Sequence, residues 1–470
     1  MRTQRLYVDG AWLDGNGTLE VRSPWDRSVV GTVAVATREQ VDLAVQAAHR
    51  ALQEPLPPYE RAAILHRATA LLEQRRDEFA ETLLREAGKP RKAAEAELHR
   101  AILTLRWAAE EAARLPGETV PMDAVASGAD TIGFTLPEPV GVVAAITPFN
   151  FPVNLVLHKI APAVAAGCPV VLKPSEKTPL SAGLLVEVFE QAGLPAGLLN
   201  LVTGDPAQIV AALNDSPLVT LVTFTGSSRV GWQLKAASPT KRHVLELGSN
   251  TAMVVMPSAD LGAAASAVVS AGFAFSGQAC VSLQRLYVHT EVVDDLVAQI
   301  RAAMTGLTVG DPGDPATDIG PLITPESTER VRGWLADAEA AGAKILAGGG
   351  VVDGVLEPTV ITGVAPQSPL ICEEVFGPVV TLVPVASLGE ALTAVNSSRF
   401  GLNTAIYSND LREVRRYVSQ AQAGTVLVNR PAAYRSDHMP YGGVKESGEG
   451  REGIRYAIEA MLHQKLVVLG

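Results

Sequence analysis

Short β-like runs alternate with helix-like segments along most of the chain, and this alternation constrains the fold more than any other feature. Between residues 169 and 248 the runs are PVVLKPS, LLNLVTG, VTLVTFTG and HVLELG, with helix-like segments between the first three. After residue 250 the pattern resumes with TAMVVMP, RLYVHT, VVTLVPV, NTAIYS and GTVLVN. Strands separated by helices of this length form βαβ units, so the sequence predicts α/β architecture with parallel sheets.

The N-terminal part of the chain has a different rhythm. From about residue 38 to 115, apolar residues recur at intervals of three and four, which predicts helices, and Gly117 follows them. The segment TIGFTLPEPVGVVAAITP then indicates β structure interrupted by prolines. Because 470 residues exceed what one core normally holds, we expect two α/β domains that meet near residue 247.

Composition excludes several classes of function. The net charge of −11 argues against a nucleic-acid or anionic-membrane partner. The N-terminus has no apolar signal-like region, and no stretch has the length and apolarity of a membrane span. The three cysteines lie far apart without metal-site spacing, which predicts a reducing compartment, here the cytoplasm, and no metal.

Several polar residues stand where ligands bind in open α/β sheets, beyond the carboxyl ends of strands. Lys173 and Glu176 follow one predicted strand, where they could address ribose hydroxyls or belong to a solvated loop. Ser227, in FTGSSRVG, lies at a glycine turn before a helix. Such a helix start can hold a phosphate through its backbone amides, although the same residues also form ordinary N-caps.

Cys280, in SGQACVSLQR, has two interpretations from its residue type alone. Free cysteine is most often a small buried hydrophobe, and it is less often a nucleophile. Glu246 ends a predicted strand 34 residues earlier and could be a salt-bridged carboxylate or a general base.

Seven motifs in order resemble the NAD(P)-dependent aldehyde dehydrogenase superfamily over nearly the whole chain. They are TPFNFP (147–152), LKPSE (172–176), FTGSSRVG (224–231), LELGSN (245–250), SGQACVSLQR (276–285), EEVFGPV (373–379) and PYGGVKESGEGREG (440–453). The resemblance implies that Cys280 attacks an aldehyde, giving a thiohemiacetal and then a thioester. It assigns oxyanion stabilisation to Asn150 and the Cys280 backbone N–H, and thioester hydrolysis to Glu246 as general base.

The resemblance also implies a cofactor site. Lys173 and Glu176 would hold the adenosine ribose, Ser227 the pyrophosphate, and Glu374 the nicotinamide ribose. The other positions assigned to the cofactor are Phe149, Gly226, Val230 and Phe376. A carboxylate at Glu176 repels a 2′-phosphate, so we expect NAD to be preferred, with NADP as the alternative.

The motifs around Cys280 resemble a branch that contains lactaldehyde, succinic semialdehyde, phosphonoacetaldehyde and non-phosphorylating glyceraldehyde-3-phosphate dehydrogenases. Many of these substrates are small anions, and Arg100, His158 and Arg435 could bind one. The alternatives are a surface charge, a satisfied helix residue and a structural ion pair, respectively. Our hypothesis is oxidation of a small anionic aldehyde to its acid.

Other functions remain as alternatives. One is a broad-specificity short-chain aldehyde dehydrogenase. Others are a coenzyme A-acylating dehydrogenase or acyl-phosphate reductase, which Glu246 argues against. A catalytically silent binding protein is disfavoured because Cys280, Glu246, Asn150 and Lys173 occur together.

The family architecture implies a domain division. Residues 1–117 and 138–246 would form a Rossmann-like dinucleotide-binding domain, and residues 247–430 the catalytic domain. Residues 118–137 and 455–470 would form a small β bridging element for oligomerisation. Because exposed strand edges need partners, we expect a homodimer or homotetramer.

Overall fold

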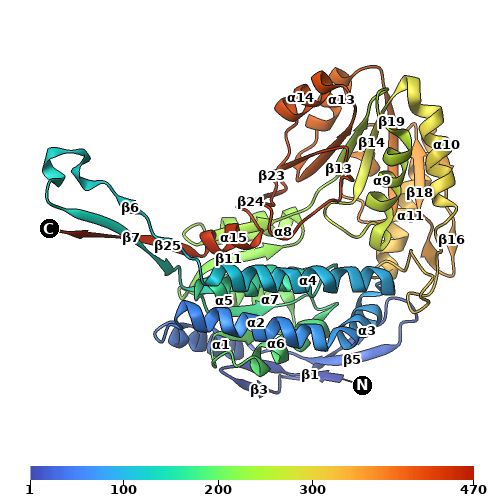
Figure 1. The fold of residues 1–470 in the computed structure, drawn as a ribbon. Helices are drawn as coiled ribbons and strands as arrows, with labels where there is room; N and C mark the ends of the chain where they lie inside the picture. Colours follow the sequence, from blue (N-terminus) through green and yellow to red (C-terminus); the bar gives the residue numbers. More distant parts are fainter. Residues whose placement is uncertain (1) are drawn as a thin grey trace.

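The computed structural model describes residues 2–470, and two large sheets dominate it (Figure 1). The first sheet has eight strands, in the spatial order β24 (Gly448–Glu449), β12 (Arg242–Glu246), β11 (Val219–Thr225), β8 (Val142–Ile146), β9 (Val170–Lys173), β10 (Leu199–Leu201), β2 (Leu6–Val8) and β3 (Ala11–Leu13). The five strands from β12 to β10 run parallel, and antiparallel strands close both edges. The parallel sheet predicted from the alternation is confirmed.

Helices cover both faces of this sheet because its central strands are apolar on both sides. In β8, Val143 and Ala145 face one core, whereas Val142, Ala144 and Ile146 face the other. The first face carries α2 (Pro58–Gln74), α3 (Arg76–Ala87), α4 (Arg91–Ala112), α5 (Asn154–Ala166), α6 (Pro179–Gln191) and α15 (Ile454–Ala460). The second face carries α1 (Arg38–Ala51), α7 (Pro206–Asp215) and α8 (Ser228–Ala237). The helical stretch expected from residue 38 to 115 therefore comprises four helices, α1 to α4.

The second sheet has seven strands, and only its edge strand β15 is antiparallel to its neighbour. Their order is β15 (Lys344–Ala347), β18 (Thr359–Thr362), β19 (Val379–Val385), β14 (Leu283–His289), β13 (Thr251–Val255), β21 (Asn403–Tyr407) and β22 (Thr425–Val428). Two helices cover one face, α9 (Leu261–Phe273) and α10 (Val293–Met304), and two cover the other, α13 (Leu388–Asn396) and α14 (Leu411–Gln420). A third cluster holds α11 (Pro325–Ala340) and α12 (Pro369–Cys372) beside β18.

After β22 the chain returns to the first sheet, and this return changes the expected domain division. Strand β24 pairs with β12, and α15 packs against α5. Ile454, Ile458, Met461 and Leu462 lie in the first core because they complete the apolar face of α5 and α4. The segment 455–470 is therefore divided: α15 belongs to the first domain, and only β25 (Leu462–Leu469) leaves it.

Strand β25 forms an extension that protrudes from the body of the molecule and carries the C-terminus (Figure 1). It pairs antiparallel with β7 (Ile132–Pro139), which also pairs with β6 (Thr119–Val120). Two short 3-10 helices connect β6 to β7, η1 (Met122–Ala124) and η2 (Ala126–Gly128). The sheet order β25-β7-β6 leaves the outer edge of β25 without a strand partner among residues 2–470.

The remaining elements are small. A three-stranded sheet joins β1 (Arg2–Gln4), β5 (Val29–Ala34) and β4 (Thr18–Arg22), and two pairs join β16 (Val351–Val352) to β17 (Val355–Leu356) and β20 (Phe400–Gly401) to β23 (Val444–Lys445). Short 3-10 helices precede and follow β14, η3 (Ala274–Gly277) and η4 (Thr290–Val292). Across residues 2–470, none of the helices combines the length and the apolarity needed to cross a membrane.

Candidate active site

The carboxyl ends of the first sheet's strands open onto a cavity of about 820 Å³. Register places these ends side by side, since Ile146 of β8 pairs with Lys173 of β9, and Thr225 of β11 pairs with Glu246 of β12. Every catalytic and cofactor position assigned by the resemblance lines this cavity: Phe149, Asn150, Lys173, Glu176, Gly226, Ser227, Val230, Glu246, Cys280, Glu374 and Phe376. Its volume lies within the range of small-molecule sites.

A strained turn delivers Cys280 to the cavity from the second domain. Phe275, Ser276 and Gly277 have consecutive positive φ angles of 47°, 55° and 71°. A Cβ at Gly277 would lie 2.1 Å from the carbonyl oxygen of Gly377, so this position requires glycine. The Ser276 hydroxyl donates to the Gly320 carbonyl at 2.7 Å and fixes the turn.

The contacts of Gln278 explain why the SGQAC motif contains a glutamine. Its side-chain oxygen accepts from the Ile323 backbone N–H at 2.8 Å. Its backbone carbonyl accepts from the Asn150 side-chain amide at 3.0 Å. Gln278 therefore links the loop before Cys280 to the residue expected to stabilise an oxyanion.

The thiol of Cys280 is partly exposed and opens onto the cavity, with protein on its other sides. This burial raises the pKa of Cys280 to about 11, and the Glu246 and Glu374 carboxyls act in the same direction. Tyr441 and Arg435 oppose them: the Tyr441 hydroxyl lies 3.2 Å from the sulfur, and both groups lower the pKa of the thiol. Two of these neighbours therefore favour the thiolate, and the two carboxyls favour the neutral thiol.

Glu246 is buried, with 4% of its surface exposed, and neither carboxyl oxygen has a hydrogen-bond partner within residues 2–470. Burial raises its pKa well above the usual value, and the neighbouring Glu452 carboxylate raises it further. Glu452 itself is ionised, because Lys159 and Arg435 outweigh its burial and lower its pKa. The Ser249 hydroxyl lies 3.5 Å from that of Thr251, so Ser249 leaves the Glu246 carboxyl free of a bond from its side chain.

A buried ion pair holds Asn150 in place, and the sequence analysis missed it. The Lys89 ammonium donates to the Asn150 carbonyl at 2.6 Å and forms a salt bridge with Glu97, and neither side chain of the pair is exposed. Glu97 also accepts from the backbone N–H groups of Val153, at 2.9 Å, and Asn154, at 3.0 Å, at the start of α5. Both charges lie far from the recognised motifs: Lys89 is in the loop between α3 and α4, and Glu97 is inside α4, so no sequence pattern pointed to them.

The cofactor side of the cavity is lined by charged and polar groups, which fits a polar ligand. The Lys173 ammonium lies 3.7 Å from the Glu176 carboxylate, so both heads face the same space. The buried Ser228 hydroxyl at the start of α8 has no partner among the described residues. Burial raises the pKa of Glu374 to about 7, although the carboxyl accepts from the Ser249 N–H at 3.0 Å. The Phe149 and Phe376 rings meet edge-on, 5.7 Å apart.

The three candidate anion-binding residues lie close to one another, but carboxylates already contact them. Asp437 accepts from Arg100 at 2.7 and 3.1 Å and lies 2.8 Å from the His158 ring nitrogen. Arg435 donates to Glu452 at 2.9 Å. Burial and Arg435 lower the pKa of His158, which is therefore neutral at pH 7. The sequence suggested the cations and missed both carboxylates.

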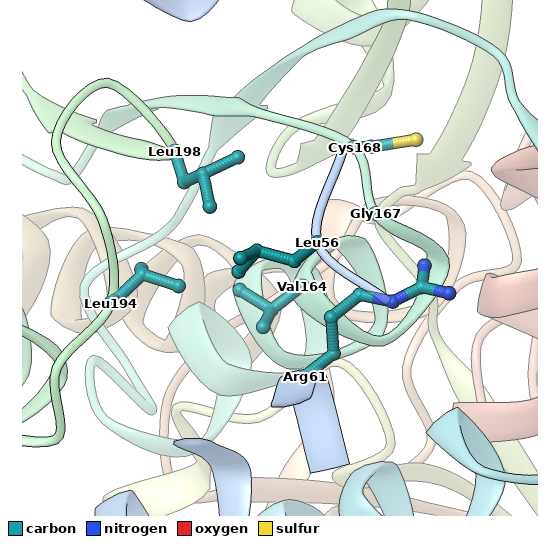
Figure 2. A pocket seen from close by; sticks show the side chains of 7 residues that line it. All are labelled: Leu56, Arg61, Val164, Gly167, Cys168, Leu194 and Leu198. Carbon is teal, nitrogen blue, oxygen red and sulfur yellow. The ribbon is translucent and has the colours of Figure 1, made fainter. Parts of the chain in front are cut away.

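Cys168 lines a different, small pocket and does not line the reaction site (Figure 2). This pocket holds about 10 Å³, enough for one water molecule, between α2, the end of α5 and the loop before β10. Its lining is mostly apolar, with Leu56, Val164, Leu194 and Leu198 around the Arg61 side chain. Cys168 is buried there and donates to the Met461 carbonyl at 3.2 Å, so it has no space for a substrate.

Within the described part of the chain, no group of three or more His, Cys, Asp or Glu side chains is arranged to hold a metal ion.

Comparison with known proteins agrees with this geometry. The model of the aldehyde dehydrogenase family matches residues 12–467. The 3-sulfolactaldehyde dehydrogenase of Priestia aryabhattai is 43% identical over 464 residues, which are 99% of this chain and 97% of that protein.

Two solved structures are also similar over the whole chain. Aldehyde dehydrogenase 21 from Physcomitrella patens, in complex with the reaction product succinate, is 36% identical with a TM-score of 0.96, covering 100% of this chain and 98% of that one. The NADP-dependent glyceraldehyde-3-phosphate dehydrogenase from Bacillus halodurans C-125, complexed with NADP, is 34% identical with a TM-score of 0.97, covering 100% of both chains. The chain therefore belongs to the aldehyde dehydrogenase family and is an NAD(P)-dependent aldehyde dehydrogenase.

Proposed function

We propose that this enzyme oxidises a small anionic aldehyde to its carboxylic acid, with Cys280 as nucleophile and NAD as the preferred cofactor. The observation that supports it most directly is the convergence of Cys280, Glu246 and Asn150 in one cavity with the cofactor positions. In this mechanism the Cys280 thiolate attacks the aldehyde carbon. The Asn150 amide and the Cys280 backbone N–H stabilise the resulting oxyanion.

The second half of the reaction depends on Glu246. A nicotinamide held by Glu374 and Phe376 would supply the hydride acceptor needed to convert the thiohemiacetal into a thioester. Glu246 then removes a proton from the water that hydrolyses the thioester. Because burial raises the pKa of Glu246 and that of Cys280, a higher pH increases the deprotonated fraction of both groups. Turnover therefore rises as the pH is raised from 7 towards 9.

Replacing Glu246 separates the two half-reactions. We expect Glu246→Gln to lower kcat by about 10² to 10⁴-fold, the usual contribution of a general base, while one equivalent of NADH per active site still forms in a burst. Stopped-flow absorbance at 340 nm measures both phases. Glu449→Gln is the matched control, since Glu449 lies on the adjacent strand β24 and pairs with Lys235. Unchanged steady-state turnover in Glu246→Gln, or turnover that requires coenzyme A in the wild type, would contradict the hydrolytic mechanism.

Charge around the thiol favours an anionic substrate. Arg100, Lys159 and Arg435 are three cations, and they face the two carboxylates Asp437 and Glu452. His158, which lies beside them, is neutral because burial lowers its pKa. Among these five charged groups one positive charge is in excess, and a substrate anion would balance it. The names of the three relatives include a sulfonate, a carboxylate and a phosphate, which supports this class of substrate.

Arg100 is the most accessible of these cations, with 28% of its side chain exposed against 6% for Arg435. We expect kcat/KM for succinic semialdehyde to exceed that for butanal by tenfold or more, which is about 1.4 kcal/mol of discrimination. In Arg100→Gln the ratio should fall to about threefold or less, because the guanidinium is lost. Arg106→Gln, on the same helix with an exposed ion pair, should keep the wild-type ratio. Equal rates for both aldehydes in the wild type would favour a broad short-chain enzyme instead.

Glu176 supports the preference for NAD over NADP. Its carboxylate shares the cavity with Lys173 and is 36% exposed, so a 2′-phosphate placed there would meet a negative charge. We expect Glu176→Gln to raise kcat/KM for NADP relative to NAD by about tenfold, by removing that repulsion. Steady-state kinetics with both cofactors measures the ratio, and Glu190→Gln, exposed near the end of α6, serves as the control. A wild-type enzyme that prefers NADP would refute the assignment.

The extension formed by β6, β7 and β25 supports a role in assembly with a second copy of the chain. Five of its apolar side chains are 44–62% exposed: Ile132, Leu136, Leu466, Val468 and Leu469. An eight-residue edge strand with such residues is a site for strand or surface pairing. We expect the wild type to be at least a dimer.

The double variant Leu466→Glu and Val468→Glu should dissociate to monomers, since it places two charges on the apolar surface. Sedimentation equilibrium measures the mass. The control Leu411→Glu changes an equally apolar residue that is 69% exposed at the start of α14, and it should leave the mass unchanged. A monomeric wild type would disprove this assembly.

A further inference from the structure

The hydroxyl group of Tyr441 contacts the sulfur of Cys280. The two atoms lie 3.2 Å apart, within hydrogen-bond distance for sulfur, and this is the only hydrogen bond of the Tyr441 hydroxyl among residues 2–470. The tyrosine is buried, with 1% of its surface exposed. A buried phenol normally directs its O–H at a partner, and here that partner is the reacting atom.

Contacts with Glu452 and Arg435 fix Tyr441 in this position. Its backbone pairs with Glu452 through two hydrogen bonds of 3.0 and 2.6 Å. The Arg435 guanidinium lies over the face of its ring, 3.7 Å from the ring centroid. Arg435 is itself held by the Glu452 carboxylate at 2.9 Å. The phenol is therefore preorganised before any substrate binds.

The surroundings of the sulfur show why a donor matters there. Four ionisable groups face the thiol: the Tyr441 phenol, the Arg435 guanidinium and the Glu246 and Glu374 carboxyls. The carboxyls disfavour a thiolate, and Arg435 favours it but is engaged by Glu452. Tyr441 supplies the direct donor to the sulfur. Burial raises its own pKa well above the usual value, so the phenol keeps its proton and does not compete as an anion.

We propose that Tyr441 is a catalytic residue that stabilises the Cys280 thiolate by donating its O–H to the sulfur. The proposal rests on Cys280 being the nucleophile. In this step the S–H bond of Cys280 breaks and its proton passes to a water molecule, while the O–H bond of Tyr441 stays intact. A hydrogen bond from a neutral donor to an anion is shorter and stronger than one between neutral groups, so Tyr441 binds the thiolate more tightly than the thiol.

Tyr441→Phe tests the inference because it removes only the hydroxyl and keeps the ring under Arg435. The full-length enzyme is treated with iodoacetamide at pH values from 7 to 9.5 without cofactor, and mass spectrometry follows the peptide that contains Cys280. We expect the alkylation rate of Cys280 to fall about tenfold at each pH. This corresponds to an increase of about one in the pKa of the Cys280 thiol. The slope against pH should stay the same, and kcat/KM for the aldehyde should fall with it.

Two controls separate this effect from loss of structure. Cys372, which is exposed in the same chain, should react at equal rates in wild type and variant. Tyr434→Phe makes the same chemical change at a residue that is 45% exposed, and it should leave the alkylation of Cys280 unaltered. A melting temperature close to that of the wild type confirms that Tyr441→Phe is folded.

Each outcome decides between the inference and its alternatives. If the hydroxyl only fills space, its removal opens access to the sulfur, and equal or faster alkylation of Cys280 in Tyr441→Phe overturns the proposal. If the wild type keeps its activity after Cys280 is alkylated, the nucleophile assignment fails as well. Loss of activity on alkylation, together with equal rates in the two proteins, overturns the role of Tyr441 alone.

Discussion

The site depends on the antiparallel pairing of β24 with the end of β12. This pairing, Leu245 with Glu449 and Glu246 with Gly448, returns a segment of the chain from the second domain to the edge of the first sheet. It requires a glycine, since a Cβ at Gly448, where φ is +146°, would lie 2.1 Å from the Leu245 carbonyl oxygen. The returning segment brings Arg435 and Tyr441 to the thiol of Cys280. The nucleophile and its surroundings therefore come from segments more than 150 residues apart.

Burial makes the charges around the thiol interdependent. Lys159 and Arg435 hold the carboxylate of Glu452 in its ionised form, and that carboxylate raises the pKa of Glu246. Breaking one partner of such a pair leaves an uncompensated charge in a region of low polarity, which costs several kcal/mol. The same arrangement thus fixes the geometry of the segment and raises the pKa of Glu246. The structural and catalytic contributions of these residues have one physical origin.

Much of this could be predicted from the sequence, and the exceptions share a cause. The alternation of strands and helices predicted the parallel sheets, and ordered motifs identified the residues that line the cavity. Local patterns did not reveal the carboxylates Asp437 and Glu452, because their partners are up to 337 residues away in the chain. The sequence analysis began the bridging element at residue 455. It overlooked that Ile454 and Ile458 have the helical spacing of a core-facing stripe. Lys89 and Glu97 were missed because buried charged residues are rare.

The contrast between Cys168 and Cys280 shows what distinguishes a reactive thiol here. Burial raises the pKa of Cys168 and that of Cys280 to about 11, so a low thiol pKa does not separate them. The two thiols differ in the space that opens onto the sulfur and in the groups that surround it. Cys168 adjoins a pocket with room for one water molecule, whereas Cys280 opens onto about 820 Å³. Tyr441 and Arg435 favour the thiolate of Cys280 and two carboxyls disfavour it, so a change of charge in any one of them alters the stability of the thiolate. Reactivity therefore follows from the groups that the fold assembles around the sulfur, and burial alone does not produce it.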